Sequence, residues 1–402
     1  MTKVEIMDVP LLDLKLQYAP LRAEIQKRIA AICDSQIFCL GTKVVELEQE
    51  LADYCGAAFA FGASSGTDAQ LVLMMALGIG PGDAVITTPY TFFSTAGCIA
   101  RLGAIPIFAD IDPATYNLDP VKVREYLEEK CHRSSDGSIV NEDGLVLRAI
   151  IPVHLFGCCA EMNAFRAIGA EYGLHIMEDS AQSIGAEYGL SDGSAGRSGS
   201  MGDSSYFSFY PTKNLGAFGD AGMATCRDDG LATRVDALRN HGMSPRYYHS
   251  MIGGNFRMDA IQATVLQAKL PYLDDWSAAR FENAERYRRL FNQADLLQHL
   301  TLPAEPHAGR DLKHHHIYNQ YIIRTNQRDA LKAHLQANNI GCEIYYPLSL
   351  HQQECFAYLG CKKGDFPESE RAALETLALP IFPELRPEQQ ETVVARIREF
   401  FN

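Results

Sequence analysis

The sequence lacks any apolar stretch long enough to cross a membrane. Its 402 residues are 47% hydrophobic and 21% charged, a balance typical of soluble globular enzymes, and no apolar run reaches the roughly 20 residues that a spanning helix needs. The amino-terminal stretch MTKVEIMDVPLLDLK is interrupted by the charges of Lys3, Glu5, Asp8 and Asp13, so it lacks the continuous apolar core of a secretory signal. We therefore expect a cytoplasmic protein with no membrane partner.

Basic residues are also scarce. The chain has 36 Lys and Arg against 50 Asp and Glu, which gives a net charge of -14. Because nonspecific binding of nucleic acid depends on Lys and Arg neutralising phosphates, we expect no nucleic-acid partner.

Disulfide and metal-binding patterns are missing too. The eleven cysteines are an odd number and include no CxxC pair, which favours buried reduced thiols. The cysteines that lie in apolar runs are Cys98, Cys158, Cys159 and Cys226. The three histidines at 314–316 have no accompanying cluster of carboxylates or thiols, and consecutive side chains on a strand point to alternate faces, so we expect no metal site.

Two common nucleotide-binding signatures are absent. No G-x-G-x-x-G follows a predicted strand, and no G-x-x-x-x-G-K-[ST] occurs anywhere; GIGPGD, at 78–83, has the wrong spacing and follows a predicted helix. A dinucleotide-binding Rossmann site and a P-loop are therefore not expected.

What the sequence does contain, from about residue 58, is an alternation of strand-like and helix-like segments. The strand-like segments are short, β-branched and nearly all apolar, which favours strands covered on both faces. They are AAFAFGAS, DAVITTP, IPIFAD, RAIIPVHLF and LHIMED, and helices are predicted to begin at Thr67, Phe92, Pro120 and Glu161. This pattern predicts an α/β fold with a mostly parallel sheet.

The second half of the chain changes character. The strands SSYFSF and AGMATC follow a Gly/Ser-rich stretch, GLSDGSAGRSGSMGDSS, that predicts a loop, and the polar segment 131–144 predicts a surface excursion. After a long helix over about 259–295 come a strand in HHIYNQYIIRT, a helix, a strand in IGCEIYYP and a last helix after Pro387. We expect two domains: residues 1–255, with the amino-terminal helices and the large α/β domain, and residues 256–402, a smaller α+β domain.

A candidate anion site follows the first strand of the large domain. Ligands of open α/β sheets gather at the carboxyl ends of strands. There the backbone N–H groups of Gly66, Thr67 and Asp68, with the Thr67 hydroxyl, meet at the positive end of a helix dipole and suit a phosphate. The alternative is that Ser64, Ser65 and Thr67 only cap the helix.

Aromatic and acidic residues follow two other strands. Phe92 and Phe93 lie near the start of a helix, and we expect one of them in the core and the other free to lie against a planar ligand. Glu178 and Asp179 end LHIMED, and Gln182 follows. A carboxylate in an apolar strand is costly unless it is paired, so we expect a cationic partner for one acid; the alternative is an Asp that caps a helix.

Lys213 lies between the aromatic run FSFYPT and the glycine-rich segment GAFGDAG, which can wrap closely around a bound group. Partial desolvation would lower the pKa of its ammonium, so that the amine could form a Schiff base with an aldehyde. Pyridoxal 5′-phosphate (PLP) fits all these sites: its phosphate suits the helix start and Ser208, its ring an aromatic face, its ring nitrogen Asp179, and its aldehyde Lys213. We expect PLP as the cofactor.

The motifs SGTDA, TPYTFFST, EDSAQ, FSFYPTKNLG, GGNFRMDAIQA and YYPLSLHQQ resemble those of the DegT/DnrJ/EryC1/StrS aminotransferases. These are fold-type I PLP enzymes that aminate nucleotide-linked keto sugars, and the resemblance covers nearly the whole chain. It implies that Lys213 forms the Schiff base, that Asp179 binds the pyridine nitrogen, and that Gln182 lies near the ring hydroxyl. The other implied cofactor contacts are Gly66, Thr67, Asp68 and Ser208 at the phosphate, and Phe92 over the ring, where some relatives have tryptophan.

The resemblance also implies a homodimer with shared active sites. The asparagine of a GGNFRMD-type segment, here Asn255, reaches the phosphate in the neighbouring subunit, although from the residues alone it is only a turn residue. Substrate contacts are expected from RNHGMSPRYYHSMIGGNFR and YYPLSLHQQ, although the first segment can instead be a mobile polar loop. The candidate substrate residues are Arg246, Tyr247, Tyr248, Arg257, Tyr346 and His351.

Dehydratases of the family replace the Schiff-base lysine by histidine, so the intact Lys213 favours a transaminase, with L-glutamate as donor by family analogy and ping-pong kinetics. The carboxy-terminal segments resemble members acting on 3-keto sugars more than those acting at C-4, with dTDP or UDP as the nucleotide. Such an enzyme would serve polysaccharide or antibiotic synthesis. Two other interpretations remain: a non-enzymatic regulatory protein, although the acidic chain shows no basic recognition helix, and a transaminase of small amino acids.

Overall fold

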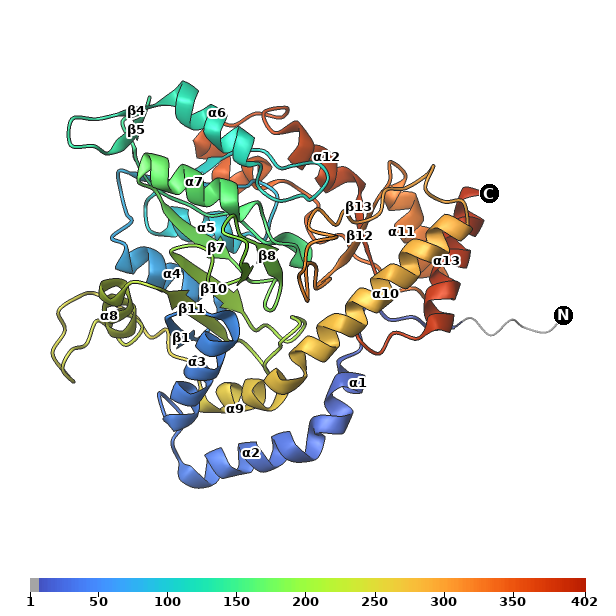
Figure 1. Cartoon of the computed structure of the whole chain (residues 1–402), viewed down its shortest axis with the longest axis horizontal. Coiled ribbons are helices and arrows are strands. Elements are labelled where there is room, and N and C mark those ends of the chain that lie inside the picture. Colours follow the sequence, from blue (N-terminus) through green and yellow to red (C-terminus); the bar gives the residue numbers. More distant parts are fainter. Residues whose placement is uncertain (1–6) are drawn as a thin grey trace.

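A mixed sheet lies at the centre of the larger part of the protein (Figure 1). The computed structural model describes residues 7–402, so Lys3 and Glu5 lie outside the described residues. The strands lie in the order β1-β11-β10-β7-β6-β2-β3. Their bounds are β1 Phe59–Ala63, β2 Asp83–Thr87, β3 Ile105–Phe108, β6 Val146–Ile150, β7 His175–Asp179, β10 Ser204–Ser208 and β11 Gly222–Cys226. Only β11 runs antiparallel to its neighbours in this series, which confirms the predicted α/β fold with a mostly parallel sheet.

Helices cover both faces of this sheet because each strand alternates its side chains between two cores. Along β7, Ile176 faces one core and Met177 faces the other. The Met177 core lies under α4 (Gly66–Ala76), α5 (Ser94–Arg101) and α8 (Asp229–Leu238). The opposite face is covered by α6 (Pro120–Lys130), α7 (Met162–Tyr172), α3 (Thr42–Cys55) and α9 (Ala260–Lys269).

A smaller domain contains a two-stranded antiparallel sheet of β12 (Tyr321–Arg324) and β13 (Thr376–Leu379). In Figure 1 the helix α10 runs diagonally from the large domain towards it. The helices of this part are α10 Leu273–Gln293, α11 Arg328–Ala337, α12 Pro367–Glu375 and α13 Pro387–Phe401. Residues before α1 (Leu14–Tyr18) also join the smaller domain, since Val9 is buried in its core and bridges Ile340.

Two predicted elements of the second half are wrong. The helix over 259–295 is interrupted, because Pro271 has no N–H to continue the helical hydrogen bonds; a 3-10 turn at Leu270–Tyr272 separates α9 from α10. The segment IGCEIYYP forms only isolated bridges, such as Glu343 with Ala378. The second strand of the smaller sheet is instead β13, whose short TLAL run leads directly out of α12.

Both segments predicted as irregular contain hairpins. The Gly/Ser-rich stretch at 189–205 contains β9 (Ala195–Arg197), which pairs with β8 (Glu187–Gly189), whose last residue begins the stretch; the excursion at 131–144 contains β4 (Cys131–Arg133) paired with β5 (Ile139–Asn141). The chain reverses at Gly193 and Gly137 with φ of 87° and 89°, a conformation that glycine adopts without strain.

The packing of α9 bears on the division into domains. This helix buries Ala263 and Leu266 with Leu47 of α3 and Phe207 of the sheet, and α2 (Arg22–Ser35) packs on its outer side through Ile25 and Val265. A boundary between 255 and 256 stays a prediction, and this packing favours a later one, at the start of α10.

No helix within residues 7–402 is both long and apolar enough to cross a membrane. All eleven cysteines are free, and Cys98, Cys158, Cys159 and Cys226 are buried, as predicted.

Candidate active site

Lys213 lies in the loop between β10 and β11, five residues after Ser208. Its backbone N–H donates to the Tyr210 carbonyl over 2.8 Å, which closes a turn around the lysine. Burial lowers the pKa of the Lys213 amine to about 8, although the nearby carboxylate of Asp179 acts in the opposite direction. The side chain is half-buried. The geometry therefore agrees with the desolvated nucleophile that the sequence predicts.

Asp179 ends β7 and is 4% exposed. Its Oδ2 accepts a hydrogen bond from the Thr95 hydroxyl over 2.8 Å, and its Oδ1 accepts one from the Ala181 N–H over 3.1 Å. Among the described residues no cationic group lies within ion-pair distance of it, so Lys213 acts on it only through space. The next element along the chain is β8, which rules out the alternative of a helix-capping Asp.

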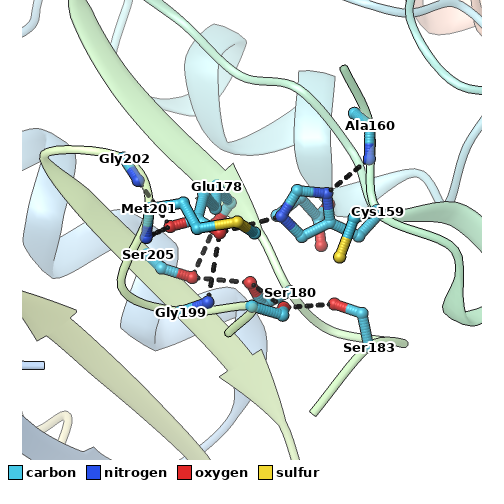
Figure 2. Close-up of polar contacts among 12 residues, drawn as sticks. Cys159, Ala160, Glu178, Ser180, Ser183, Gly199, Met201, Gly202 and Ser205 are labelled. Carbon is cyan, nitrogen blue, oxygen red and sulfur yellow. Dashed lines mark hydrogen bonds and ion pairs between the residues drawn. The ribbon is translucent and has the colours of Figure 1, made fainter. Parts of the chain in front are cut away.

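Glu178, the neighbour of Asp179, contacts the loop at 199–202 (Figure 2). Its Oε1 accepts hydrogen bonds from the N–H groups of Met201 and Gly202, each over 2.7 Å, and its Oε2 accepts one from Gly199 over 3.1 Å. The same Oε2 lies 2.8 Å from Nε2 of His154. The carboxylate is fully buried, so Glu178 fixes the loop before β10 and is not available to a ligand.

The tautomer of His154 follows from its second contact. The Ala160 N–H donates to Nδ1 over 3.0 Å, so Nδ1 is an acceptor and the ring hydrogen is on Nε2, where it can be donated to Glu178. His154 was not among the predicted site residues; an apolar strand ending in VHLF gave no sign of its partner.

The predicted phosphate residues lie together at the start of α4. An added Cβ on Gly66 would lie 2.8 Å from Cβ of Ser208, so the end of β10 and the helix start are in close contact. The capping alternative is confirmed for Ser65, which accepts the Asp68 N–H over 3.1 Å, and phosphate binding by this segment stays a prediction. The Ser64 hydroxyl in turn donates to Asp68 Oδ2 over 2.6 Å.

Phe92 and Phe93 are 61% and 48% exposed, so the expectation that one of them belongs to the core is wrong. Both residues precede α5, which begins at Ser94. Phe93 packs on Phe356 with ring centroids 5.6 Å apart, whereas Phe92 keeps a free ring face, as contact with a planar ligand would require.

Gln182 and Tyr346 are brought together from opposite ends of the chain. The Gln182 amide donates to the Tyr346 hydroxyl over 2.7 Å, and its Oε1 accepts the Phe156 N–H over 2.7 Å. Tyr346 is buried beside Tyr90, with ring centroids 5.5 Å apart, so its hydroxyl is fixed in position and holds the Gln182 amide in one orientation. His351, by contrast, is buried with Nε2 3.1 Å from Glu370 Oε1.

The four other candidate substrate residues lie in or next to an exposed loop after α8. Tyr247 and Tyr248 are exposed, and the Arg246 guanidinium lies 4.8 Å above the Tyr247 ring. Arg257 donates to Asn240 over 3.0 Å and to the exposed Asn255 over 2.9 Å. Within the described part of the chain, no hydrogen bond or ion pair joins this loop to Lys213 or Asp179. Their role in substrate binding stays a prediction.

Sequence reasoning missed two residues that contact Asp179. Thr95 belongs to the TPYTFFST motif, but its position in the first turn of a helix suggested nothing beyond helix initiation. Tyr206 of β10 pairs with Asp179 in the sheet, and burial together with that carboxylate raises the pKa of its hydroxyl.

The three histidines at 314–316 each have a different neighbour. His314 lies 3.8 Å from Asp274, His315 lies 3.7 Å from Glu305, and His316 stacks on Tyr318 with ring centroids 3.8 Å apart. In residues 7–402 no group of three or more His, Cys, Asp or Glu side chains is arranged to hold a metal ion.

This arrangement has counterparts among known proteins. The sequence profile of the DegT/DnrJ/EryC1/StrS aminotransferase family matches residues 20–398. The chain belongs to this family. A protein of Geobacillus stearothermophilus named pleiotropic regulatory protein is 44% identical, over 98% of this chain and 99% of its own. The UDP-N-acetyl-3-dehydro-alpha-D-glucosamine 3-aminotransferase of Acidithiobacillus ferrooxidans is 38% identical over 97% of each chain.

Solved structures agree with the sequence relatives. The crystal structure of S. venezuelae DesV in complex with a ketimine intermediate is 35% identical to this chain, has a TM-score of 0.86 and covers 98% of both chains. The protein is an aminotransferase, and its fold is that of the PLP aminotransferases.

The cofactor of this family is PLP, and the residues of this chain fit it. Gly66 and Ser208 form a cradle that a side chain at position 66 would fill, at the positive end of the α4 dipole. Lys213 supplies an amine of lowered pKa, and Asp179 supplies a buried carboxylate at the end of a neighbouring strand. Together these groups match a phosphate, an aldehyde and a ring nitrogen.

Proposed function

We propose that this aminotransferase converts a dTDP- or UDP-linked 3-keto sugar to the 3-amino sugar, with L-glutamate as the amino donor and ping-pong kinetics. The proposed chemistry rests on the presence of two groups at one edge of the sheet: the Lys213 amine, whose pKa is about 8, and the buried carboxylate of Asp179. The choice of substrate is supported by relatives named for 3-amino or 3-keto positions of UDP- and dTDP-linked sugars.

In this proposal Lys213 moves the proton. When bound, PLP supplies an aldehyde for the amine and a ring that accepts electron density from the carbon that loses its proton. With a pKa of about 8, roughly a tenth of the Lys213 amine is neutral at pH 7, far more than for an exposed lysine, and this neutral form can remove the proton from the α-carbon of the donor. The same group, once protonated, returns a proton to the carbon of the keto sugar.

Asp179 and the residues around it complete the site. A carboxylate facing the ring nitrogen favours the protonated form of that nitrogen, and the hydrogen bonds from Thr95 and Ala181 hold the carboxylate in one orientation. Gln182, supported by Tyr346, is proposed to bind the ring hydroxyl. Gly66, Thr67, Asp68 and Ser208 are proposed to bind the phosphate, and Phe92 to cover the ring.

We further propose a homodimer with shared sites. Asn255 is exposed on a segment that runs beside Ala63, just before the phosphate cradle, and its amide would reach the phosphate in the neighbouring subunit. The exposed Arg246, Tyr247 and Tyr248, with Arg257 at the base of their loop, would contact the nucleotide-linked substrate.

A substrate panel tests the proposed reaction. The purified enzyme would be incubated with glutamate and, in turn, dTDP- and UDP-linked 3-keto and 4-keto sugars, and the position of the new amine determined by NMR. We expect amination of a 3-keto substrate. Turnover of 4-keto sugars alone would replace the proposal by the C-4 alternative, and turnover of small keto acids alone would exclude a sugar substrate.

The name of the Geobacillus relative makes a regulatory role the second candidate. A ligand-binding regulator needs neither an amine of lowered pKa nor a buried carboxylate at the ring nitrogen, and both support catalysis here. The two functions differ in a simple measurement. An enzyme loses the visible absorbance of its bound cofactor when glutamate is added and regains it with a keto substrate, whereas a regulator shows no such cycle.

A further inference from the structure

A second buried lysine lies beneath the loop that carries Lys213. Lys269, the last residue of α9, is 3% exposed. Within the described residues it has no carboxylate at ion-pair distance; instead its Nζ donates to the Gly216 carbonyl over 2.6 Å and lies 5.0 Å from the centre of the Phe218 ring. Burial lowers the pKa of its amine to about 8. Burying a cation without a carboxylate partner costs free energy of folding, which indicates that the contacts made by the Lys269 ammonium have a function.

Gly216 is a sensitive point of that loop. An added Cβ at this position would clash with the Pro211 carbonyl, so the chain after Lys213 folds back onto the residues just before it. The Ala217 N–H then donates to the Phe209 carbonyl over 2.8 Å. Any movement of Gly216 therefore changes both ends of the segment in which Lys213 is held.

The same helix holds the loop at a second point. Gln262 accepts the Phe218 N–H over 2.8 Å and donates to the Phe218 carbonyl over 3.2 Å. Gln262 and Lys269 are seven residues apart and so share one face of α9. Phe218 itself is 43% exposed and makes an edge contact with Tyr18 at 5.5 Å, so apolar burial alone does not fix this loop.

We propose that Lys269 is a positioning residue for the reaction of Lys213. Its ammonium makes a charge-assisted hydrogen bond to Gly216 and a cation–π contact to Phe218, which together hold the loop in the conformation that aims Lys213 at the site. A methionine has similar length and would avoid the cost of desolvation, but it would leave the Gly216 carbonyl without its donor. The proposal rests on the aminotransferase chemistry and not on the identity of the sugar.

The variant Lys269→Met tests this role in the holoenzyme. Because the substitution removes a buried charge as well as a hydrogen bond, we expect the melting temperature to stay within a few degrees of wild type. We expect amide hydrogen exchange in the peptide covering 214–219 to become at least 10-fold faster, kcat for the glutamate half-reaction to fall about 10-fold or more, and KM to change little. Lys122→Met, at an exposed lysine of α6, is the matched control and should change none of these.

Two results would overturn the proposal. One is normal exchange at 214–219 with normal kcat, which would mean that the loop does not need the cation. The other is a parallel loss of melting temperature, of exchange protection throughout the chain and of kcat, which would assign Lys269 to general stability. Gln262→Leu removes the hydrogen bonds to the Phe218 backbone without removing a charge. It should also make hydrogen exchange at 214–219 faster and kcat lower, and it provides the test if Lys269→Met fails to fold.

Discussion

The hydroxyl of Thr95 donates a hydrogen bond to Oδ2 of Asp179 over 2.8 Å, and both side chains are buried. This contact joins the first turn of α5 to the end of β7, although the two residues are 84 positions apart in the sequence. Phe92 lies just before α5, so one segment orients the carboxylate that is proposed to face the ring nitrogen and presents the aromatic side chain that is proposed to cover the ring.

Thr95→Val should therefore slow turnover while leaving the cofactor bound. The valine keeps the shape of threonine but removes a hydrogen bond to a charged group, which is worth about 1.5–3 kcal/mol, or roughly 10- to 100-fold in rate if the cost falls on the reacting state. Thr95→Ser, which retains the hydroxyl, should stay near wild type. The measurement is kcat for the glutamate half-reaction, with cofactor content determined in parallel. Equal rates for the two variants would mean that the Thr95 hydroxyl does not contribute to turnover through Asp179.

Substitution of the neighbouring acids Glu178 and Asp179 should have different effects, on stability for Glu178 and on turnover for Asp179. Glu178→Gln places amide hydrogens among backbone donors in a buried site, so we expect a loss of about 3 kcal/mol in the free energy of unfolding. Asp179→Asn can still accept from Ala181 through Oδ1 and can donate from its amide nitrogen to the Thr95 hydroxyl, so we expect a small change in stability but a loss of turnover on the order of 100-fold. Urea unfolding measures the stability of both variants, and single-turnover kinetics measure their rates. A stable but inactive Glu178→Gln together with an unstable but active Asp179→Asn would mean that Glu178, and not Asp179, serves the reaction.

The sequence predicts much of this arrangement because strand ends can be recognised from local patterns. The apolar runs around β1, β2, β7 and β10, and the SGTDA and EDSAQ motifs that follow them, suffice to place Gly66, Asp179 and Lys213 at one edge of the sheet. The sequence predicts Asp179 as the carboxylate of the site, but it does not predict the role of the adjacent Glu178, because the contacts of Glu178 depend on the tertiary position of the 199–202 loop.

Contacts between distant segments account for what could not be predicted. Tyr346 meets Gln182 across 164 residues, and Lys269 meets Gly216 across 53, so neither pairing leaves a local pattern. The exposure of Phe92 and Phe93 could not be predicted for a related reason: whether apolar residues beside a helix start are covered depends on distant segments, such as the one that brings Phe356 onto Phe93.

The lowered pKa of Lys213 predicts a pH dependence of stability in the cofactor-free protein. The folded-state pKa is about 8 and that of an unfolded lysine is about 10.4, so between these values the unfolded chain binds the additional proton. Stability contributed by this group therefore rises with pH from about 8 to 10, by at most about 1.4 kcal/mol per pH unit. Lys213→Met lacks this contribution. The unfolding free energy of wild type minus that of the variant should therefore increase between pH 8 and pH 10. A constant difference would contradict the shift.

The proposed reaction also depends on this residue. Lys213→Ala removes the amine that is proposed to bind the cofactor aldehyde, so we expect the visible absorbance of the lysine-bound cofactor and all turnover to disappear. The variant should still fold, because the half-buried side chain makes no ion pair within the described residues. Residual transamination by this variant would exclude Lys213 as the group that moves the proton.

Mixing two inactive variants tests the proposed sharing of sites between subunits. Lys213→Ala removes the amine of its own site, whereas Asn255→Asp places a negative charge where the neighbouring subunit is proposed to bind phosphate. If each site combines Lys213 of one chain with Asn255 of the other, a mixed dimer has one site with both residues intact and one with neither. Random exchange of equal amounts makes half of the dimers mixed, so about a quarter of wild-type activity should return. If both residues serve the same subunit, every site in a mixed dimer carries one lesion, and unfolding, mixing and refolding the two variants together should restore no activity.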